Sequence, residues 1–188
     1  MNKNKVSLVI SAPSGTGKTT IITRLLADSD LYSFSVSTTT RNMRDGEVNG
    51  KNYYFVSIDT FNRMIKKSEF AEWATVHKNF YGTQKKEVDR IINEGKIPIF
   101  DIDVQGAIRL KEVLINGVFI FILPPNMEEL EKRLRLRHTD TEEQIKVRLK
   151  NAVEEMKSKE LFDFILVNEK VDDVVEKIAS IIDSKLKA

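Results

Sequence analysis

The chain has no cysteine and only a few residues of several other kinds. Its 188 residues include 4 prolines and 2 histidines, and none of them is a cysteine. This composition excludes a disulfide framework, a thiolate metal site and a thiol nucleophile, and it makes a reducing compartment, the cytoplasm, the expected location. The histidines, His77 and His138, complete no convincing Ser/His/Asp set. We therefore expect them to have surface or packing roles rather than catalytic ones.

Charge of one sign and long hydrophobic runs are also missing. The 30 basic and 28 acidic residues leave a net charge of +2, and no aromatic stripe is interleaved with the basic residues, so nothing favours a nucleic-acid partner. The apolar stretch that begins at Val6 soon reaches a glycine-containing loop, which leaves it too short for a signal peptide or a membrane span. We expect one soluble globular domain with no membrane contact.

What the sequence does contain is an alternation of short apolar runs and amphipathic stretches. The apolar runs, rich in β-branched residues and typical of buried parallel strands, are residues 6–10, 97–102, 118–123 and, shorter, 164–167. The stretches with apolar residues at helical spacing are 18–27, 126–137, 141–159 and 171–186. Alternation of this kind predicts an α/β fold in which helices cover a parallel central sheet.

A loop joins the first predicted strand to the first predicted helix. In such a loop backbone N–H groups curve around a β-phosphate, a lysine reaches the β- and γ-phosphate oxygens, and a hydroxyl binds Mg²⁺. We expect Lys18 and Thr19 to have the last two roles, and Ala12, where glycine is usual, to be a tolerated variation. The expected ATP-binding residues of this segment are Ala12, Pro13, Ser14, Gly15, Thr16, Gly17, Lys18, Thr19 and Thr20.

Residues 38–90 interrupt the alternation. Short strand-like pieces are separated there by polar turns, and the stretch includes Gly46, Gly50, Gly82, Tyr53, Tyr54, Phe55 and Trp73. Such composition is typical of irregular structure and small sheets rather than of another strand-helix unit. We expect an inserted substrate-binding lobe of mixed α+β structure.

An acidic pair lies at the end of the predicted strand 97–102. Asp101 and Asp103 flank the apolar Ile102. In P-loop proteins a carboxylate at this position holds the water shell of the metal ion, so Asp101 together with Thr19 is the expected Mg²⁺ site. The alternative for either aspartate is a solvated strand edge or a helix N-cap.

The sequence resembles the guanylate kinase family along essentially its whole length. The matching motifs are the phosphate loop, Thr39-Thr40-Arg41-x-x-Arg44-x-Gly46-Glu47-x-x-Gly50, Glu72-Trp73, Tyr81-Gly82-Thr83, Asp101-x-Asp103-x-Gln105-Gly106, and Arg133-Leu134-x-x-Arg137 followed by Thr139-Asp140. The resemblance implies ATP-dependent phosphorylation of GMP, and of dGMP, in guanine nucleotide metabolism and GMP recycling. It implies a P-loop NTPase three-layer fold with a core (1–37, 91–125, 160–188), a GMP-binding lobe (38–90) and a helical lid (126–159).

The resemblance also assigns a set of residues to the phosphate of the acceptor nucleotide: Arg41, Arg44, Tyr53 and Tyr81. Two guanidinium forks three residues apart, together with tyrosine hydroxyls, suit a phosphate chemically. A lone Arg-x-x-Arg pair is more often a solvated surface, but this loop also contains glycines and Glu47. We therefore place Glu47 in the expected GMP site as well.

Guanine presents N1–H and an exocyclic amine on one edge, and a carboxylate can accept from both. By the resemblance Glu72 has this role, and Ser37, Thr83 and Asp103 complete the contacts to the base. The alternative for Glu72 is an ordinary surface acid beside Trp73. Because an unsatisfied buried polar group is costly, such a site would prefer GMP to AMP by orders of magnitude.

The expected chemistry needs no general base. The attacking oxygen belongs to the acceptor phosphate, which is largely ionised near neutral pH because its second pKa is about 6. Transfer would rest on positioning and on charge neutralisation by Mg²⁺ and by the cations Lys18, Arg41, Arg137 and Arg148. Arg133, Arg137 and Asn168 would complete the ATP site, and Val167-Asn168 resembles the family's loop beside the adenine. A lid on 126–159 would close over both nucleotides; the alternative there is an ordinary basic helix face.

Three positions depart from the family pattern, and two rival functions are disfavoured by the residues present. Met43, Lys78 and His138 stand where proline, glycine and glycine are usual, but they remove no assigned group. A non-catalytic, phosphopeptide-binding module of the guanylate kinase type is disfavoured because Lys18 and Thr19 are present. A kinase for another nucleoside monophosphate, such as AMP or a pyrimidine nucleotide, is disfavoured by Glu72 together with Ser37. The oligomeric state stays open.

Overall fold

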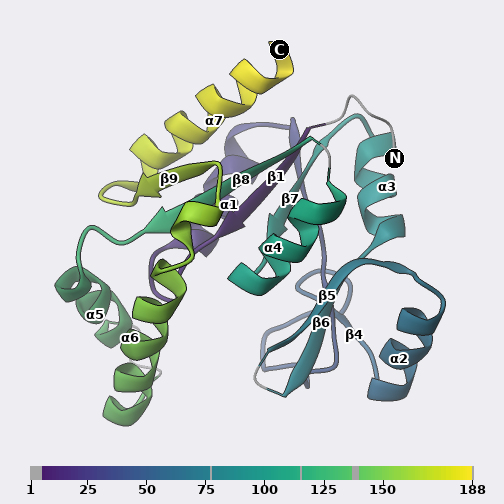
Figure 1. Cartoon of the computed structure of the whole chain (residues 1–188), viewed down its shortest axis with the longest axis horizontal. Helices are drawn as coiled ribbons and strands as arrows, with labels where there is room; N and C mark the ends of the chain where they lie inside the picture. Colours follow the sequence, from purple (N-terminus) through teal and green to yellow (C-terminus); the bar gives the residue numbers. More distant parts are fainter. Residues whose placement is uncertain (1–5, 77, 115, 137–139, 188) are drawn as a thin grey trace.

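The computed structural model describes residues 6–76, 78–114, 116–136 and 140–187, and the strands of this part form two sheets (Figure 1). The larger sheet has five parallel strands in the order β2-β7-β1-β8-β9. Their bounds are β1 Ser7–Ser11, β2 Tyr32–Phe34, β7 Ile97–Asp101, β8 Gly117–Leu123 and β9 Phe164–Val167. The predicted parallel central sheet is confirmed. Strand β2 was not predicted because three residues are too few to show a periodic pattern.

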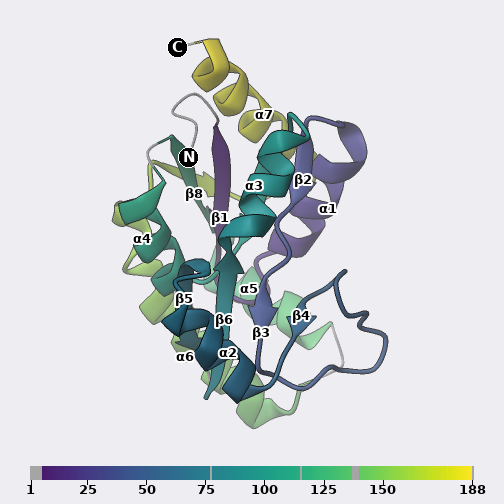
Figure 2. The same ribbon diagram turned by 90° about the vertical axis from the view of Figure 1, so that its right-hand side faces the viewer.

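Helices cover both faces of this sheet. One face packs against α1 (Lys18–Asp28) and α7 (Val171–Lys187), and the other against α3 (Lys85–Asn93) and α4 (Val104–Val113). Figure 2 shows α1 and α4 on opposite sides of β1. Consecutive residues of β1 therefore enter different hydrophobic clusters, and both faces being buried explains its unbroken apolar run. The three-layer α/β class is confirmed.

Strand β9 differs from the prediction in its burial. It has the predicted bounds, but it lies at the edge of the sheet, next to β8 only. Phe164, Ile165 and Val167 keep 41%, 38% and 43% of their surface exposed. The prediction of a buried strand was therefore wrong for 164–167, because apolar composition does not distinguish a central strand from an edge strand.

The second sheet belongs to the segment that interrupts the alternation. Its order is β4-β3-β6-β5, with β3 Thr38–Thr39, β4 Tyr54–Phe55, β5 Phe70–Val76 and β6 Asn79–Gln84. Helix α2 (Ile58–Lys66) begins at Ser57, whose hydroxyl accepts a hydrogen bond from the N–H of Thr60. From α2 the fully buried Phe61 stacks on Phe70 and Phe80, with ring centroids 4.4 and 5.4 Å apart. The lobe thus has a small aromatic core of its own.

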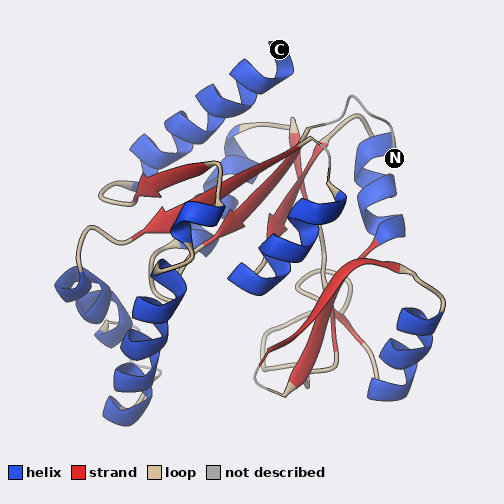
Figure 3. Ribbon diagram, viewed as in Figure 1, coloured by secondary structure: helices blue, strands red, loops and turns tan. Residues whose placement is uncertain are grey.

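Two helices form a third unit: α5 (Met127–Arg135) and α6 (Glu142–Met156), followed by a 3-10 turn at Lys159–Leu161. Asn126 and Thr141, the first residues of the two predicted helical stretches, are the N-caps of these helices, but α6 ends earlier than the predicted residue 159. Leu130, Leu134 and Ala152 pack together between the two helices. Figure 3 shows this helical pair and the second sheet on either side of the region toward which the core strands point.

Candidate active site

The loop between β1 and α1 has the backbone geometry of an anion-binding turn. Gly15 and Gly17 have φ angles of +94° and +101°, which lie in the left-handed region that favours glycine. Gly17 is the N-cap of α1, and no side chain caps the helix there. The first N–H groups of α1 are therefore available to a ligand, and the helix dipole favours a negative one.

Ala12 is compatible with the start of this loop. Within the described residues only Ser68 and Lys78 combine a side chain with a positive φ, so Ala12 has an ordinary backbone conformation. It is 8% exposed and belongs to the hydrophobic cluster between the sheet and α1. A methyl group therefore fits where glycine is usual.

The lysine of the loop is paired with the carboxylate at the end of the neighbouring strand. The register of β1 and β7 places Ile10 beside Asp101, so the loop and Asp101 lie at adjacent carboxyl ends. Lys18 Nζ is 2.6 Å from Asp101 Oδ1 and also donates to the carbonyl of Ile102 at 3.2 Å. The exposed Thr19 follows Lys18 on α1. This arrangement gathers a cation, a carboxylate and a hydroxyl at one edge of the sheet.

A cavity of about 230 Å³ extends from Lys18 and Asp101 into the second sheet. Its other lining residues are Ser37, Tyr53, Glu72, Ala74, Val76, Tyr81, Gly82, Ile102, Asp103 and Gly106. Five of the residues expected to bind GMP are thus gathered in one cavity: Ser37, Tyr53, Glu72, Tyr81 and Asp103. The same cavity also reaches Lys18 and Asp101, where the phosphates are expected.

Glu72 enters this cavity from β5 and is held by the neighbouring strand β6. Its Oε1 accepts hydrogen bonds from the N–H of Thr83 at 3.1 Å and from the hydroxyl of Thr83 at 2.8 Å. Thr83 is completely buried. The two donors occupy Oε1 and leave Oε2 to face Gly106, where an added Cβ would lie only 3.3 Å from it.

Burial makes Glu72 an unusual carboxyl. It is 7% exposed, and desolvation raises its pKa to about 7, with the nearby Asp103 adding to the rise and the Thr83 hydrogen bonds opposing it. Ionised Glu72 therefore gains most from a ligand that brings donors to Oε2. The edge of a guanine base brings two.

Asp103 has a structural role as well as a position in the cavity. It is the N-cap of α4, and its Oδ1 accepts from the N–H of Gly106 at 2.8 Å. An added Cβ at Gly106 would be 3.1 Å from this same oxygen. Glycine at 106 thus keeps the space between Asp103 and Glu72 open.

Arg41 is pre-oriented by an acid and by aromatic rings. Its Nη2 is 2.7 Å from Glu47 Oε1, and this hydrogen bond raises the pKa of Arg41 and lowers that of Glu47. Its guanidinium carbon lies 5.4 and 5.6 Å from the ring centres of Tyr53 and Phe55. Burial, with the charge of Asp101, raises the pKa of Tyr53 to about 12, so this hydroxyl stays a donor at neutral pH.

Arg44 and Arg148 line a second hollow of about 680 Å³. It lies between the phosphate loop, the loop that joins β3 to β4, and helix α6. Arg148 donates from Nη1 to the hydroxyl of Ser14 at 2.7 Å, and its Nη2 is 3.1 Å from Asp140 Oδ1. The remaining lining residues are Glu143, Gln144, Val147, Asn151 and Glu155. Arg44 thus lines this hollow with Arg148, whereas Arg41 is paired with Glu47.

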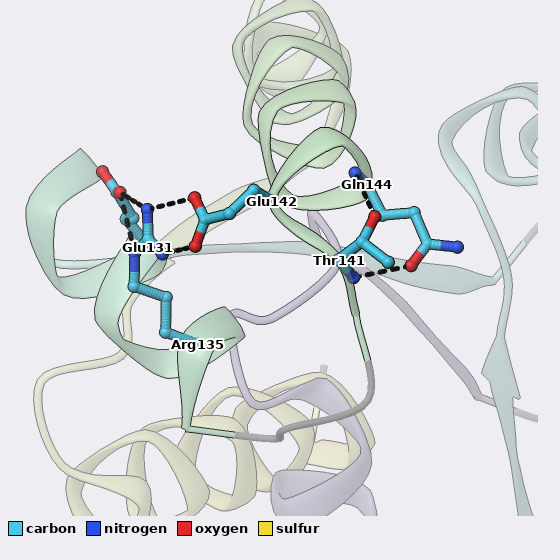
Figure 4. A network of polar contacts seen from close by, with 5 residues as sticks. All are labelled: Glu131, Arg135, Thr141, Glu142 and Gln144. Carbon is cyan, nitrogen blue, oxygen red and sulfur yellow. Dashed lines mark hydrogen bonds and ion pairs between the residues drawn. The ribbon is translucent and has the colours of Figure 1, made fainter.

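The helical pair is cross-linked by its own polar network (Figure 4). Arg135 on α5 pairs with Glu131 on the same helix at 2.7 Å and with Glu142 at the start of α6. Thr141 and Gln144 form a capping box at the same helix start. These contacts join α5 and α6, so we expect the pair to move as one unit.

Arg133 and Asn168 lie behind the phosphate loop. Arg133 Nη1 and Asn168 Nδ2 both donate to the carbonyl oxygen of Thr16, at 3.2 and 2.7 Å. The Leu130 and Leu134 side chains on α5 pack against Gly15, where an added Cβ would approach within 3.0 Å of both. The expected site residue Arg137 and the departure His138 lie outside the described residues, and so does His77.

Three residues near the site were not singled out from the sequence. Gly106 and Asp140 stand in the matched motifs, but their partners, Glu72 and Arg148, could not be read from spacing. Arg109 on α4 donates to the carbonyl of Trp73, and its guanidinium lies 5.7 Å from the Trp73 ring centre. The motif positions of Gly106 and Asp140 are the signals of these contacts that the sequence itself contained.

Comparison with known proteins decides the family. A family model described as guanylate kinase matches residues 4–185. The chain belongs to the guanylate kinase family. Guanylate kinase of Clostridium tetani is 48% identical over 178 residues, which cover 95% of this chain and 85% of the relative. Guanylate kinase of Caldanaerobacter subterraneus subsp. tengcongensis is 46% identical over 182 residues, 97% of this chain and 88% of the relative.

A solved structure shows the same architecture. The crystal structure of guanylate kinase from Anaplasma phagocytophilum superimposes with a TM-score of 0.79 at 34% identity, covering all of this chain and 89% of the other. The fold class predicted from the alternation of strands and helices is therefore shared with a guanylate kinase family structure. None of the described helices is both long and apolar enough to cross a membrane.

Proposed function

We propose that this guanylate kinase family member transfers the γ-phosphoryl group of ATP to GMP, and to dGMP, giving ADP and GDP or dGDP. The observation that carries the proposal is one continuous cavity with Lys18 and Asp101 at one end and the buried carboxyl of Glu72 at the other. The first end suits phosphates, and the second suits a base with two adjacent donors. The names and identities of the relatives support the same reaction.

At the ATP end, we propose that the loop from Ala12 to Thr20 holds the triphosphate. The support is the pair of left-handed glycines and the uncapped start of α1, which together present N–H groups to an anion. Lys18 would exchange its contact with Asp101 for the phosphate oxygens. Arg133, Arg137 and Asn168 complete the proposed ATP site.

At the GMP end, we propose that Glu72 accepts from N1–H and from the exocyclic amine of guanine, with Ser37, Thr83 and Asp103 around the base. Thr83 acts through Glu72, since both of its donors are directed at Oε1. The acceptor phosphate would lie against Arg41, Arg44, Tyr53 and Tyr81, with Glu47 orienting Arg41. Adenine has no donor pair on that edge, which would leave the carboxylate buried and unpaired.

The chemical step we propose is an in-line displacement. An ionised oxygen of the acceptor phosphate forms a bond to the γ-phosphorus, and the bond from that phosphorus to the β,γ-bridging oxygen breaks, so the electron pair leaves on ADP. No protein base is needed because the nucleophile is already ionised. The proposed catalytic cations Lys18, Arg41, Arg137 and Arg148 stabilise the charge on the transferring group.

The residues near Lys18 suit a magnesium ion that accompanies ATP. No group of three or more His, Asp or Glu side chains among residues 6–76, 78–114, 116–136 and 140–187 could hold a metal by itself. The available ligands are the Thr19 hydroxyl and the Asp101 carboxylate, and Mg²⁺ characteristically combines one or two such oxygens with phosphates and water. When bound, the ion would neutralise the β- and γ-phosphate oxygens. Thr19 and Asp101 are the proposed protein side of that site.

We propose that the chain works as a core (1–37, 91–125 and 160–188), a GMP-binding lobe (38–90) and a lid (126–159). The second sheet lies within the lobe and the helices α5 and α6 within the lid, which supports this division. Closure of lid and lobe would exclude water from the transfer and suppress hydrolysis of ATP. Because its substrates are free nucleotides, we place the enzyme in the cytoplasm.

The test is a coupled assay of ADP release with ATP and Mg²⁺, in which GMP, dGMP, AMP, CMP and UMP are compared. We expect turnover with GMP and dGMP and little with the other acceptors. Equal rates with AMP and GMP would contradict the role of Glu72. No turnover with any acceptor would contradict the enzyme and favour the non-catalytic, phosphopeptide-binding alternative.

A further inference from the structure

Two side chains that are distant in sequence converge on one backbone oxygen of the phosphate loop. The carbonyl of Thr16 accepts from Asn168 Nδ2 at 2.7 Å and from Arg133 Nη1 at 3.2 Å. Arg133 is held in turn by Glu129 at 2.9 Å, and its Nη2 donates to the backbone carbonyl of Asn168 at 3.2 Å. We call Arg133 and Asn168 the loop clamp.

The clamp fixes the orientation of the peptide that joins Thr16 to Gly17. In a trans peptide the C=O and the N–H point in opposite directions. Since the clamp binds the Thr16 carbonyl from behind the loop, the N–H of Gly17 must point away from the clamp, toward the open side of the turn. Gly17 is the N-cap of α1, so this N–H has no intrahelical partner and is free to face an anion.

The contact is close enough to require glycine at position 17. An added Cβ there would lie 2.6 Å from Asn168 Nδ2, and φ is +101°. The amide of Asn168 must also present its nitrogen to Thr16, because the reverse orientation would put two acceptor oxygens face to face. Its Oδ1 is left buried without a hydrogen-bond partner in the described structure. A buried polar atom without a partner is uncommon, so the orientation of this amide is set by its contact with Thr16.

Asn168 is poorly placed to read a nucleobase directly. Its side chain is directed into the loop, and the residue is only 2% exposed. Its backbone N–H is bonded to the carbonyl of Leu123 at 2.8 Å, which anchors the residue at the end of the core sheet. To touch adenine, the amide would have to give up its contact with Thr16.

We infer that Arg133 and Asn168 are positioning residues that act on ATP through the Thr16–Gly17 peptide. They hold the N–H of Gly17 toward the phosphates, so their contribution is to the triphosphate of ATP and not to adenine. The inference rests on the proposed function, in that the anion bound by the loop is the triphosphate of ATP.

The decisive variant is Asn168→Ala, tested with ATP and with inorganic triphosphate, each with Mg²⁺. We expect the KM for ATP and the dissociation constant of triphosphate, measured by calorimetry, to rise by the same factor, about tenfold for one buried hydrogen bond. We expect kcat to change by less than about twofold, because the loop still forms once ATP saturates it. The KM for GMP should not change. Glu169→Ala, on the next and exposed residue, is the matched control.

Other outcomes would overturn the inference. Weaker ATP binding with unchanged triphosphate binding would show that Asn168 contacts the base. A lower kcat with unchanged KM for ATP would show only a loss of folded enzyme. If Asn168→Ala does not fold, Arg133→Lys is the second variant. Lysine keeps the charge but lacks the guanidinium that contacts both Thr16 and Asn168, so the affinities for ATP and triphosphate should fall equally. A wild-type enzyme without turnover would contradict the proposed reaction, whereas triphosphate calorimetry would still test the clamp.

Discussion

The two ends of the cavity offer their proposed ligands different parts of the protein. At the proposed phosphate end these are backbone: two glycines with left-handed φ and the uncapped start of α1. At the base end they are side chains, above all the buried carboxyl of Glu72 held by Thr83. Backbone dipoles suit a diffuse negative charge that every nucleotide has, and a buried carboxyl suits one particular edge of one base.

The charged groups at the two ends also differ in their ion pairing and in their burial. Lys18 is neutralised by Asp101 at 2.6 Å, and both side chains stay partly exposed, at 19% and 27%. Glu72 is held by the neutral donors of Thr83, and burial raises its pKa to about 7. Lys18 can therefore exchange the carboxylate of Asp101 for phosphate oxygens. The ionised form of Glu72, by contrast, is destabilised by desolvation until a ligand supplies hydrogen-bond donors. We therefore expect the first end to supply most of the affinity and the second most of the selectivity.

The largest effect is expected from a substitution at the phosphate end of the cavity. Lys18→Ala removes the one side-chain cation among the described residues that line the cavity, so we expect kcat/KM for phosphoryl transfer to fall by about 10³-fold or more. Steady-state kinetics with GMP and ATP measure it, and Lys67→Ala on the exposed end of α2 is the matched control. Retention of more than a tenth of the activity would contradict the role of Lys18.

The next effect separates the two ends. Glu72→Gln turns one acceptor oxygen into a donor against the guanine edge, and we expect kcat/KM for GMP to fall by about 10²-fold while ATP affinity is unchanged. Nucleotide competition and calorimetry measure the two affinities, with Glu69→Gln just before β5 as the control. An equal loss of ATP affinity would show that the ends are not independent.

A smaller effect follows from the pKa of Glu72, which is about 7 against an ordinary value of 4.5. Guanine binding needs the ionised carboxylate, so GMP affinity should fall by about tenfold when the pH is lowered from 8 to 6. In Glu72→Gln, the pH dependence of GMP affinity should come only from the nucleotide phosphate, whose second pKa is about 6. Binding measured across this range for both proteins makes the comparison.

The same carboxyl affects folding with a defined sign. The folded protein holds the proton more tightly than the unfolded chain, so the stabilisation is complete below about pH 4.5 and is lost as the pH rises through 7. Ligand-free unfolding measured at pH 5 and pH 8 should therefore show Glu72→Gln gaining relative stability at the higher pH. A constant difference between the two proteins would contradict the raised pKa.

The smallest effect is on stability alone. Lys78 has φ +68° in the turn between β5 and β6, where a side chain is strained. Lys78→Gly should raise the free energy of unfolding by about 0.5–1 kcal/mol. This is the net result of relieving the backbone strain and of the greater conformational entropy that glycine has in the unfolded chain. Denaturant unfolding measures it, and the KM for GMP should not change. Destabilisation would show that Lys78 makes compensating contacts.

Most of the fold could be predicted because it follows from local patterns. The runs around β1, β7 and β8 are apolar throughout because both faces of the sheet are buried, and the caps at Asn126 and Thr141 mark two helix starts. Strand β2 is too short for a pattern, and the exposure of β9 depends on its edge position. Neither feature has a local cause in the chain.

The candidate site was predictable as a set of residue types but not as a set of contacts. Asp103 illustrates this, since the N-cap alternative and a position in the cavity both hold for it. Arg44 was grouped with Arg41 from their spacing, yet it lines the hollow beside Arg148. Spacing along the chain places residues on one loop, but it does not say in which direction each side chain points.

By itself, the sequence determined the α/β class, the phosphate loop and its lysine, because glycine conformations and strand periodicity depend on neighbouring residues. Only the tertiary structure decided what supports that loop. Thr16 and Asn168 are separated by 152 positions, and Thr16 and Arg133 by 117. Their meeting depends on how α5 and the end of β9 pack behind the loop. Contacts over such separations form only when the whole core has folded, because closing the intervening chain costs entropy that packing must offset.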